Sequence, residues 1–196
     1  TTAEHTIAML MSLSRHIPQA DRSMHQGAWE KSKFTGTEIT GKVLGIFGFG
    51  NIGKIVADRA LGLRMRVLVS DPFLNEQIVA KHGFELVSND VLFERSDYIS
   101  VHVPLNDTTR NLIDHKTIQS MKTGVSILNC ARGGIVNESA LLDGLNSGKI
   151  AGAAIDVFEE EPPQKDNPLL THDRVICTPH LGASTAEAQV NVAIQA

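Results

Sequence analysis

The chain has 196 residues, with 18 Lys+Arg against 22 Asp+Glu, a formal net charge of −4 and 42% hydrophobic residues. This balance is that of an ordinary soluble globular protein, and it gives no electrostatic basis for binding nucleic acid. Two cysteines, Cys130 and Cys177, cannot build a disulfide framework and form no CxxC pair, so we expect a reducing, cytoplasmic setting. No apolar run reaches the ~18–20 residues that a membrane span needs, so we expect no membrane partner.

The chain opens with a segment that predicts a helix over residues 2–16. Its apolar residues recur at three- and four-residue spacing, which places them on one helix face. That face carries Ile7, Leu10, Met11 and Ser14. Pro18 is expected to end the helix. Residues 19–41 show no clear period and carry Trp29 and Phe34, so they predict a long excursion, which we call the arm.

From Gly41 onward, short apolar runs alternate with amphipathic stretches. The apolar runs predict strands at 43–47, 66–70, 98–103, 125–129, 153–157 and 175–177. The other stretches predict helices at 52–63, 75–82, 89–94, 116–121, 137–147 and 184–196, the last with a capping box of Ser184 and Glu187. This alternation is typical of a parallel sheet covered by helices on both faces. We therefore expect an α/β fold with a Rossmann-like, doubly wound parallel sheet.

A glycine-rich loop follows the first predicted strand. Gly48, Gly50 and Gly53 match the GxGxxG pattern, and Asp71 ends the next strand, 18 residues after Gly53. In that pattern Gly48 permits the turn, Gly50 makes room for a pyrophosphate, and Gly53 lets the helix pack closely on the strand. Asp71 would bind ribose hydroxyls and repel a 2′-phosphate, which predicts NAD and not NADP. The alternative is a structural turn in which Asp71 caps the bend before Pro72.

Three polar clusters each follow a later predicted strand. They are NCARGG at 129–134, DVFEEEPP at 156–163 and TPHLGAST at 178–185. Because the carboxyl ends of parallel strands line one crevice, an Arg, a carboxylate and a His would converge there. Together they could orient an anionic substrate and carry out acid–base chemistry. Taken singly, the alternatives are a solvated arginine, an exposed acidic run and a histidine that caps a helix.

The order and spacing of these motifs resemble those of the D-isomer-specific 2-hydroxyacid dehydrogenases. The resemblance covers essentially the whole chain, from the TAEH sequence at 2–5 to HLGASTAEAQ at 180–189. It implies that residues 1–196 form the NAD-binding domain, which that family inserts between two halves of a substrate-binding domain. The substrate-binding domain is absent from this chain. Because the chain begins with Thr1 and ends inside a predicted helix, we expect a longer parent protein.

The resemblance implies a catalytic trio of Arg132, Glu161 and His180. His180 would donate a proton to the carbonyl oxygen in reduction and accept it from the hydroxyl in oxidation. Glu161 would bond the far imidazole nitrogen, and Arg132 would bind the substrate carboxylate and polarise the carbonyl. The nicotinamide supplies the hydride. Cys130 is interpreted as a small buried residue, because no base is evident beside it.

The resemblance also implies the residues that contact NAD, besides the three glycines and Asp71. They are Asn51 and Ile52 over the pyrophosphate, His102, Val103 and Pro104 beside the adenine and its ribose, Cys130, Ala131 and Arg132 at the nicotinamide ribose, and Asp156, His180, Gly182 and Ala183 around the nicotinamide. No metal ion is expected.

Within the family, the chain is most similar to members that act on 3-phosphoglycerate. This implies oxidation of that D-2-hydroxy acid to 3-phosphooxypyruvate by NAD, in serine biosynthesis. One alternative is an enzyme of the glyoxylate or hydroxypyruvate reductase type, or of the D-lactate type. Another is an NAD-sensing scaffold similar to C-terminal-binding corepressors, which bind short peptides.

A dimer contact is the last expectation. The helix at 2–16 and the arm have no obvious place in a minimal nucleotide-binding fold, and the nucleotide domains of this family carry a two-fold contact. We therefore expect residues 1–41 to form it through Ile7, Leu10 and Trp29, in a homodimer or homotetramer.

Overall fold

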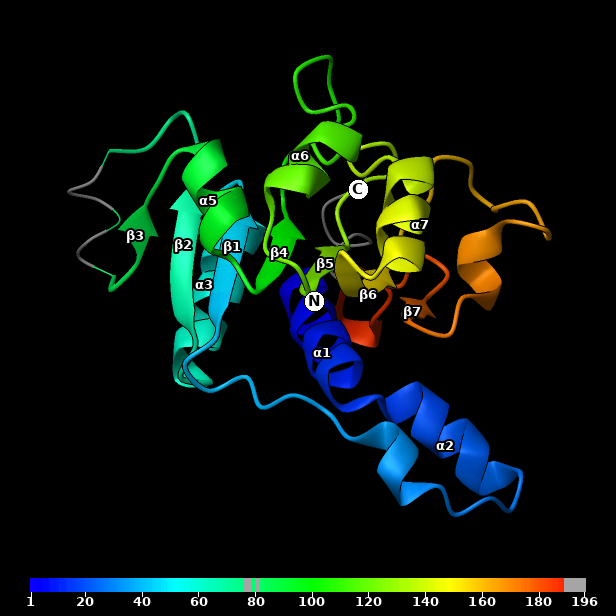
Figure 1. Ribbon diagram of the computed structural model, residues 1–196. Helices are drawn as coiled ribbons and strands as arrows, with labels where there is room; N and C mark the ends of the chain where they lie inside the picture. The colour runs from blue at the N-terminus through cyan, green and yellow to red at the C-terminus, as the bar shows by residue number, and fades with distance from the viewer. Residues whose placement is uncertain (76–78, 80–81, 189–196) are drawn as a thin grey trace.

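The computed structural model describes residues 1–75, 79 and 82–188 (Figure 1). Its strands are β1 (Val43–Phe47), β2 (Arg66–Ser70), β3 (Glu85–Leu86), β4 (Tyr98–Val101), β5 (Val125–Asn129), β6 (Ile150–Ile155) and β7 (Val175–Cys177). They form one seven-stranded sheet in the order β3-β2-β1-β4-β5-β6-β7, and all neighbours are parallel. The strand order reverses between β1 and β4, as in a doubly wound sheet. The fold predicted from the sequence is confirmed.

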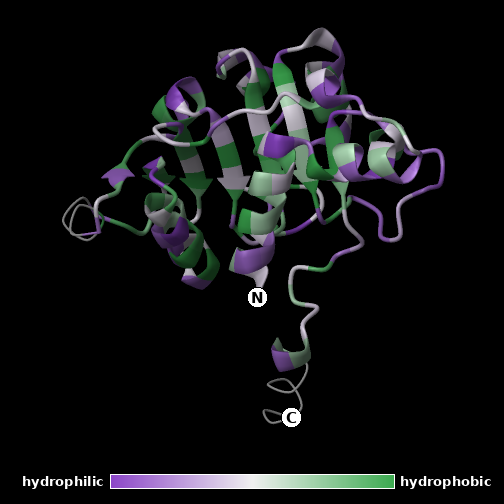
Figure 2. Ribbon diagram, turned by 90° about the horizontal axis from the view of Figure 1, so that it is seen from below, coloured by the Kyte–Doolittle hydropathy of each residue, from purple (hydrophilic) through white to green (hydrophobic). Residues whose placement is uncertain are grey.

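Helices cover both faces of the sheet. They are α1 (Thr2–Arg15), α2 (Ile17–His25), α3 (Asn51–Gly62), α5 (Asn89–Arg95), α6 (His115–Ser120) and α7 (Glu138–Ser147), with the 3-10 helices η1 (Lys31–Phe34) and η2 (Pro168–Thr171). One buried cluster joins α1 and α3 to the sheet and includes Leu10 and Leu44. A second joins α5, α6 and α7 to it and includes Leu92 and Leu141. Figure 2 shows the apolar sheet between two helix layers, with α1 at the N label.

The buried face of α1 differs from the predicted one. Its buried side chains are Ala3, Thr6, Met9, Leu10, Leu13 and Ser14. The predicted residues Ile7 and Met11 are only partly buried, at the edge of the cluster between α1 and the sheet. Leu10 is 1% exposed and packs inside the chain, so its predicted place in a dimer contact is wrong.

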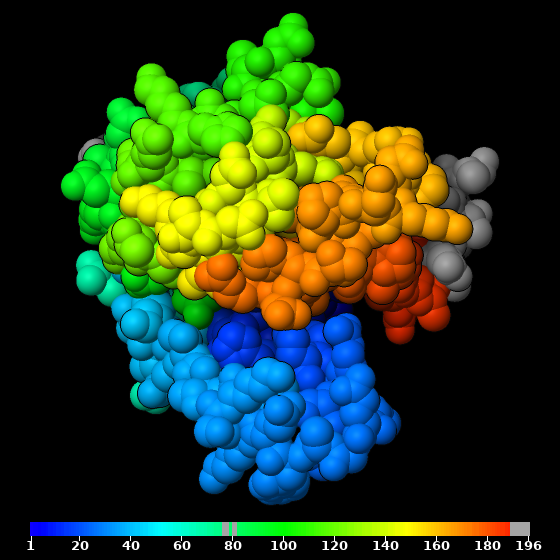
Figure 3. Space-filling view, turned by 45° about the vertical axis from the view of Figure 1, so that its right-hand side comes forward, coloured from blue at the N-terminus to red at the C-terminus, as the bar shows by residue number. Residues whose placement is uncertain are grey.

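The segment after α1 also differs from the prediction. α1 ends at Arg15 because His16 adopts left-handed backbone geometry, with φ 54°. Pro18 then lies in the first turn of α2, where its missing N–H costs nothing, so it does not end α1. The sequence did not predict α2, because its buried residue is the polar Ser23 and the helix has no apolar stripe. Figures 1 and 3 show α2 and the rest of the arm projecting from the sheet.

Other differences concern element ends. β4 stops at Val101, two residues before the predicted end, and β3 was missed because it has two residues. Residues 76–78, 80 and 81 of the helix predicted at 75–82 lie outside the described residues, as do residues 189–196 of the last predicted helix. In the described start of that last helix, the Thr185 hydroxyl accepts a hydrogen bond from the Ala188 N–H at 3.2 Å, so Thr185 is the cap in place of Ser184. Within the described ranges, no helix combines the length and apolar character needed to span a membrane.

Candidate active site

The glycine loop follows β1, at the point in the sheet where the strand order reverses between β1 and β4. Gly48 follows β1 with φ 87°, a conformation that glycine adopts without strain. Gly53 lies against the Gly48 carbonyl oxygen, which a Cβ at position 53 would overlap. The turn and the close packing that the pattern predicts are therefore both present.

The same loop has room for a diphosphate. Among the described residues, a Cβ built at Gly50 would meet nothing within 4 Å, and no side chain caps the start of α3 there. The first-turn N–H groups of a helix have no partner within the helix, and the helix dipole is positive at this end. Asn51 and Ile52 are the first residues of α3. An anionic pyrophosphate fits this open, donor-rich end.

Asp71 follows β2 and holds the glycine loop. Its Oδ2 accepts a hydrogen bond from the Phe49 N–H at 2.8 Å, and its Oδ1 accepts one from the Phe73 N–H at 2.9 Å. Asp71 therefore caps the bend after β2, as expected if the glycine loop were only a structural turn. Each carboxylate oxygen has a second lone pair, so a contact between Asp71 and a ribose is compatible with this capping and stays a prediction.

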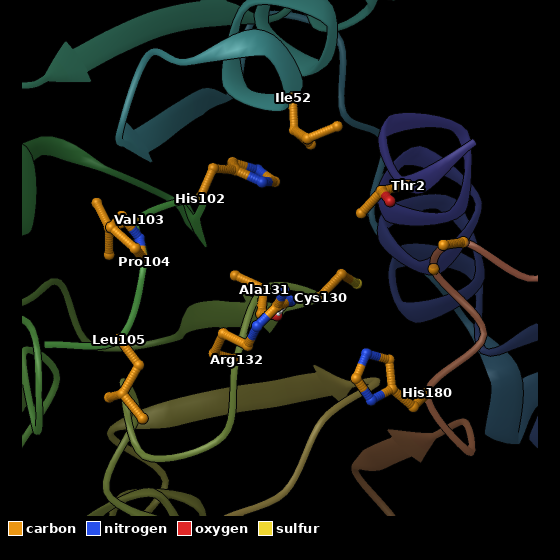
Figure 4. A pocket seen from close by; sticks show the side chains of 12 residues that line it. Thr2, Ile52, His102, Val103, Pro104, Leu105, Cys130, Ala131, Arg132 and His180 are labelled. Atoms are coloured by element: carbon orange, nitrogen blue, oxygen red, sulfur yellow. Dashed lines mark hydrogen bonds between the residues drawn. The ribbon is translucent and has the colours of Figure 1, made fainter. Parts of the chain in front are cut away.

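A pocket of about 570 Å³ opens beside the loop (Figure 4). It is lined by Thr2, Ile52, His102, Val103, Pro104, Leu105, Cys130, Ala131, Arg132, His180, Gly182 and Ala183. The structure thus brings ten of the predicted residues together from α3 and from the loops after β4, β5 and β7. Thr2 and Leu105 were missed. Thr2 carries no sequence signal, because its role depends on where α1 lies, whereas Leu105 directly follows Pro104.

His180, which lines this pocket, forms a close pair with Glu161. His180 Nδ1 lies 2.7 Å from Glu161 Oε2, and Glu161 Oε1 accepts the Phe158 N–H at 3.1 Å. Burial raises the pKa of Glu161, but the hydrogen bonds from His180 and Phe158 outweigh it and leave the pKa below its ordinary value. Glu161 therefore stays ionised beside the imidazole. A second pocket of about 540 Å³, which Glu161 lines, lies on another side of His180.

Asp156 holds the loop that carries His180. Its carboxylate is 0% exposed, and it accepts the N–H groups of Leu181 at 2.7 Å and Gly182 at 2.8 Å and the Thr178 hydroxyl at 2.6 Å. The visible role of Asp156 is therefore to shape this loop. A contact between Asp156 and the nicotinamide amide stays a prediction, because Asp156 lies below the pocket surface.

The loop after β5 places Arg132. Asn129 is 2% exposed, and its amide donates to the Arg132 carbonyl at 3.0 Å and accepts from the Ala131 N–H at 3.1 Å. The Arg132 side chain is exposed in the pocket, with Nη1 donating to the Ala131 carbonyl at 2.6 Å. The guanidinium keeps further N–H groups for an anionic ligand.

Two lining residues are held in their neutral forms. Burial raises the pKa of Cys130 to about 12, so its thiol is no nucleophile at neutral pH. Burial lowers the pKa of His102 to about 4, and its Nε2 lies 2.8 Å from the Ser100 hydroxyl. The pocket wall at these positions therefore carries no charge at pH 7.

A family model described as D-isomer specific 2-hydroxyacid dehydrogenase, NAD binding domain, matches residues 7–182. The chain belongs to this family. NAD is accordingly the cofactor of this domain, as the glycine loop predicted, and the open end of α3 fits it.

Relatives and solved structures agree with this assignment. The chain is 51% identical to a D-3-phosphoglycerate dehydrogenase of Bacillus subtilis over 195 residues, which cover 100% of the chain and 37% of the relative. It is 48% identical to one of Homo sapiens over 189 residues, 96% of the chain and 35% of the relative. A formate dehydrogenase of Staphylococcus aureus in complex with NAD superposes with a TM-score of 0.91 at 36% identity, over 97% of this chain and 57% of that one. The chain spans about a third of the length of these curated relatives.

Proposed function

We propose that the protein oxidises the D-2-hydroxy acid 3-phosphoglycerate to 3-phosphooxypyruvate with NAD, a step of serine biosynthesis. The observation that carries this proposal is the His180–Glu161 pair, 2.7 Å apart, with His180 lining the same pocket as Arg132. Identity near 50% to D-3-phosphoglycerate dehydrogenases supports the choice of substrate.

In this proposal His180, Glu161 and Arg132 have separate roles in the reaction. Bound NAD supplies the hydride acceptor. Glu161 occupies Nδ1 of His180, which leaves Nε2 to accept the proton of the substrate hydroxyl. The Glu161 carboxylate then balances the charge of the imidazolium. Arg132 binds the substrate carboxylate through its planar N–H groups and fixes the hydroxyl-bearing carbon relative to His180.

The proposed cofactor contacts follow the pocket. Gly48, Gly50 and Gly53 with Asn51 and Ile52 would bind the diphosphate, and Asp71 would bind the adenosine ribose. The neutral His102, with Val103 and Pro104, would border the adenine. The remaining contacts would surround the nicotinamide and its ribose, and they are Cys130, Ala131, Arg132, Asp156, His180, Gly182 and Ala183.

We further propose that residues 1–196 are one NAD-binding domain and that a substrate-binding domain comes from other sequence of the same protein. The coverage of the relatives supports this, since the matched region is 37% of the Bacillus subtilis relative. A cytoplasmic location is also proposed, supported by the free thiols of Cys130 and Cys177. Homodimer formation through α2 and the arm is proposed from their exposed apolar side chains.

The test uses the full-length protein that carries this chain. Mixed with NAD and 3-phosphoglycerate, it should produce absorbance at 340 nm, and NADP should be a poorer acceptor. A panel of 2-oxo acids with NADH forms the comparison. Faster turnover of glyoxylate, hydroxypyruvate or pyruvate would replace the proposed substrate. NAD binding without turnover of any acid would favour a peptide-binding scaffold and overturn the enzymatic proposal.

A further inference from the structure

His5 on α1 reaches the buried carboxylate beneath the His180 loop. Its Nε2 lies 3.2 Å from Asp156 Oδ1 and 3.2 Å from the Thr178 hydroxyl, and its side chain is 19% exposed. The sequence separates His5 from Thr178 by 173 residues. α1 is anchored on the sheet by buried residues such as Leu10, so His5 is presented from a fixed helix.

The hydrogen-bond network fixes which atom of His5 carries a proton. The Thr178 hydroxyl has one hydrogen, and it lies 2.6 Å from Asp156 Oδ1 against 4.0 Å from Met9 Sδ, so the hydrogen goes to the carboxylate. An ionised carboxylate can only accept. Both neighbours of His5 Nε2 are therefore acceptors toward it, and Nε2 must be the donor.

Asp156 accepts hydrogen bonds from three consecutive residues of the loop that carries His180. The Asp156 carbonyl accepts the His180 N–H at 2.9 Å, and its two carboxylate oxygens accept the N–H groups of Leu181 and Gly182. These hydrogen bonds matter because His180 has φ 55°, a left-handed backbone conformation that L-residues rarely adopt and that persists only when the surroundings impose it.

We propose that His5 is a positioning residue for His180. Its Nε2–H donates to the Thr178 hydroxyl and lies 3.2 Å from Asp156 Oδ1, and the Thr178 hydroxyl in turn donates to Asp156. Asp156, held in this way, keeps the loop in the form that aims His180 Nδ1 at Glu161. The assignment rests on the proposed role of His180 in proton transfer. It also gives α1 a function, because the helix that starts the chain orders a loop near residue 180.

Two amide substitutions separate this role from a general packing role. His5→Gln places an amide N–H close to the position of Nε2, whereas His5→Asn carries the same group one methylene shorter and cannot reach Asp156. His115→Asn is the control, because His115 is exposed and pairs with Asp143 at 2.9 Å. The full-length protein is used throughout, and folding is checked by circular dichroism.

The first readout needs no substrate. In NMR spectra the Nδ1–H proton of His180, identified by its loss in His180→Ala, should persist in wild type, His5→Gln and the control and should broaden or vanish in His5→Asn. The second readout is turnover, in which His5→Asn should lower kcat at least about tenfold while KM for NAD changes less than about twofold. His5→Gln should retain most of the wild-type kcat.

An unchanged His180 signal in His5→Asn would overturn the positioning role, and so would equal damage by His5→Asn and His5→Gln. A protein that shows the predicted NMR pattern but does not oxidise 3-phosphoglycerate would instead contradict the proposed substrate. The two proposals therefore fail by different observations.

Discussion

The imidazole of His180 has one nitrogen available for chemistry, because Nδ1 is engaged by Glu161 at 2.7 Å. His180→Ala removes the remaining acid–base atom, Nε2, and should lower kcat at least about a hundredfold. KM for NAD should change much less than kcat, since the proposed diphosphate and adenosine contacts at the glycine loop and Asp71 remain. Steady-state kinetics measure both constants. His115→Ala serves as the control, because His115 is exposed on α6 and pairs with Asp143. A near-normal kcat in His180→Ala would remove His180 from the mechanism.

Glu161 gives a prediction about pH. Its pKa lies below the ordinary value of 4.5, so the ionised form is favoured in the folded state. The stabilisation is fully present above the unfolded pKa and is lost as the pH falls through the lowered folded pKa. Carbon NMR of the Glu161 carboxyl should therefore show a titration midpoint below 4.5. In His180→Ala the midpoint should move up, and an unchanged midpoint would mean that His180 does not stabilise the carboxylate.

At the scale of elements, Asp97 fastens the start of β1 to β4. Its Oδ2 accepts the Val43 N–H at 2.8 Å, its N–H donates to the Val43 carbonyl at 2.9 Å, and Lys122 Nζ lies 2.9 Å from Oδ1. Burial raises the pKa of Asp97, but the hydrogen bonds from Val43 and Lys122 outweigh it, and the pKa is lowered. Asp97 lies at the opposite end of the strands from the pocket.

Asp97→Asn should therefore lower the free energy of unfolding by about 1–2 kcal/mol at pH 7, because a hydrogen bond to a charged group is replaced by one to a neutral group. A lowered folded pKa stabilises above the unfolded pKa of about 3.8 and is lost as the pH falls through the folded value, so the difference should shrink in acid. Urea unfolding of both proteins at pH 7 and near pH 3 measures this difference in the free energy of unfolding. A difference that grows in acid, or a changed kcat per folded molecule, would contradict this reading.

The sequence predicted well those elements in which burial or backbone geometry directly restricts the residue types. β1 and β5 were predicted because strands buried on both faces need apolar residues throughout. The glycine loop was predicted because a left-handed turn and a close helix contact admit only glycine at Gly48 and Gly53. α2 was missed because its contacts with the body leave no apolar stripe. The His5 contact with Asp156 was invisible because it depends on the packing of α1 under the last strands.

On the scale of the whole molecule, three of the eight large apolar side chains exposed in the described part of the chain lie within residues 17–29, on α2 and the arm. Ile17 is 54% exposed, Met24 53% and Trp29 79%, all within a segment that projects from the body (Figure 3). Large apolar side chains exposed on one projecting segment are typical of contact sites. Because Leu10 is buried in the core, a dimer contact would have to use this projecting segment rather than α1.

Trp29→Ala is the sharpest test of that contact. Burying an indole contributes strongly to association, so losing it should raise the dimer dissociation constant at least about tenfold, equivalent to about 1.4 kcal/mol. Sedimentation velocity at micromolar concentration should show a dimer for the wild type and a shift toward monomer for Trp29→Ala. Phe73→Ala is the matched control, because Phe73 is 92% exposed but lies after β2, away from α2. A monomeric wild type, or an equal shift in both variants, would show that the projecting segment does not join two chains.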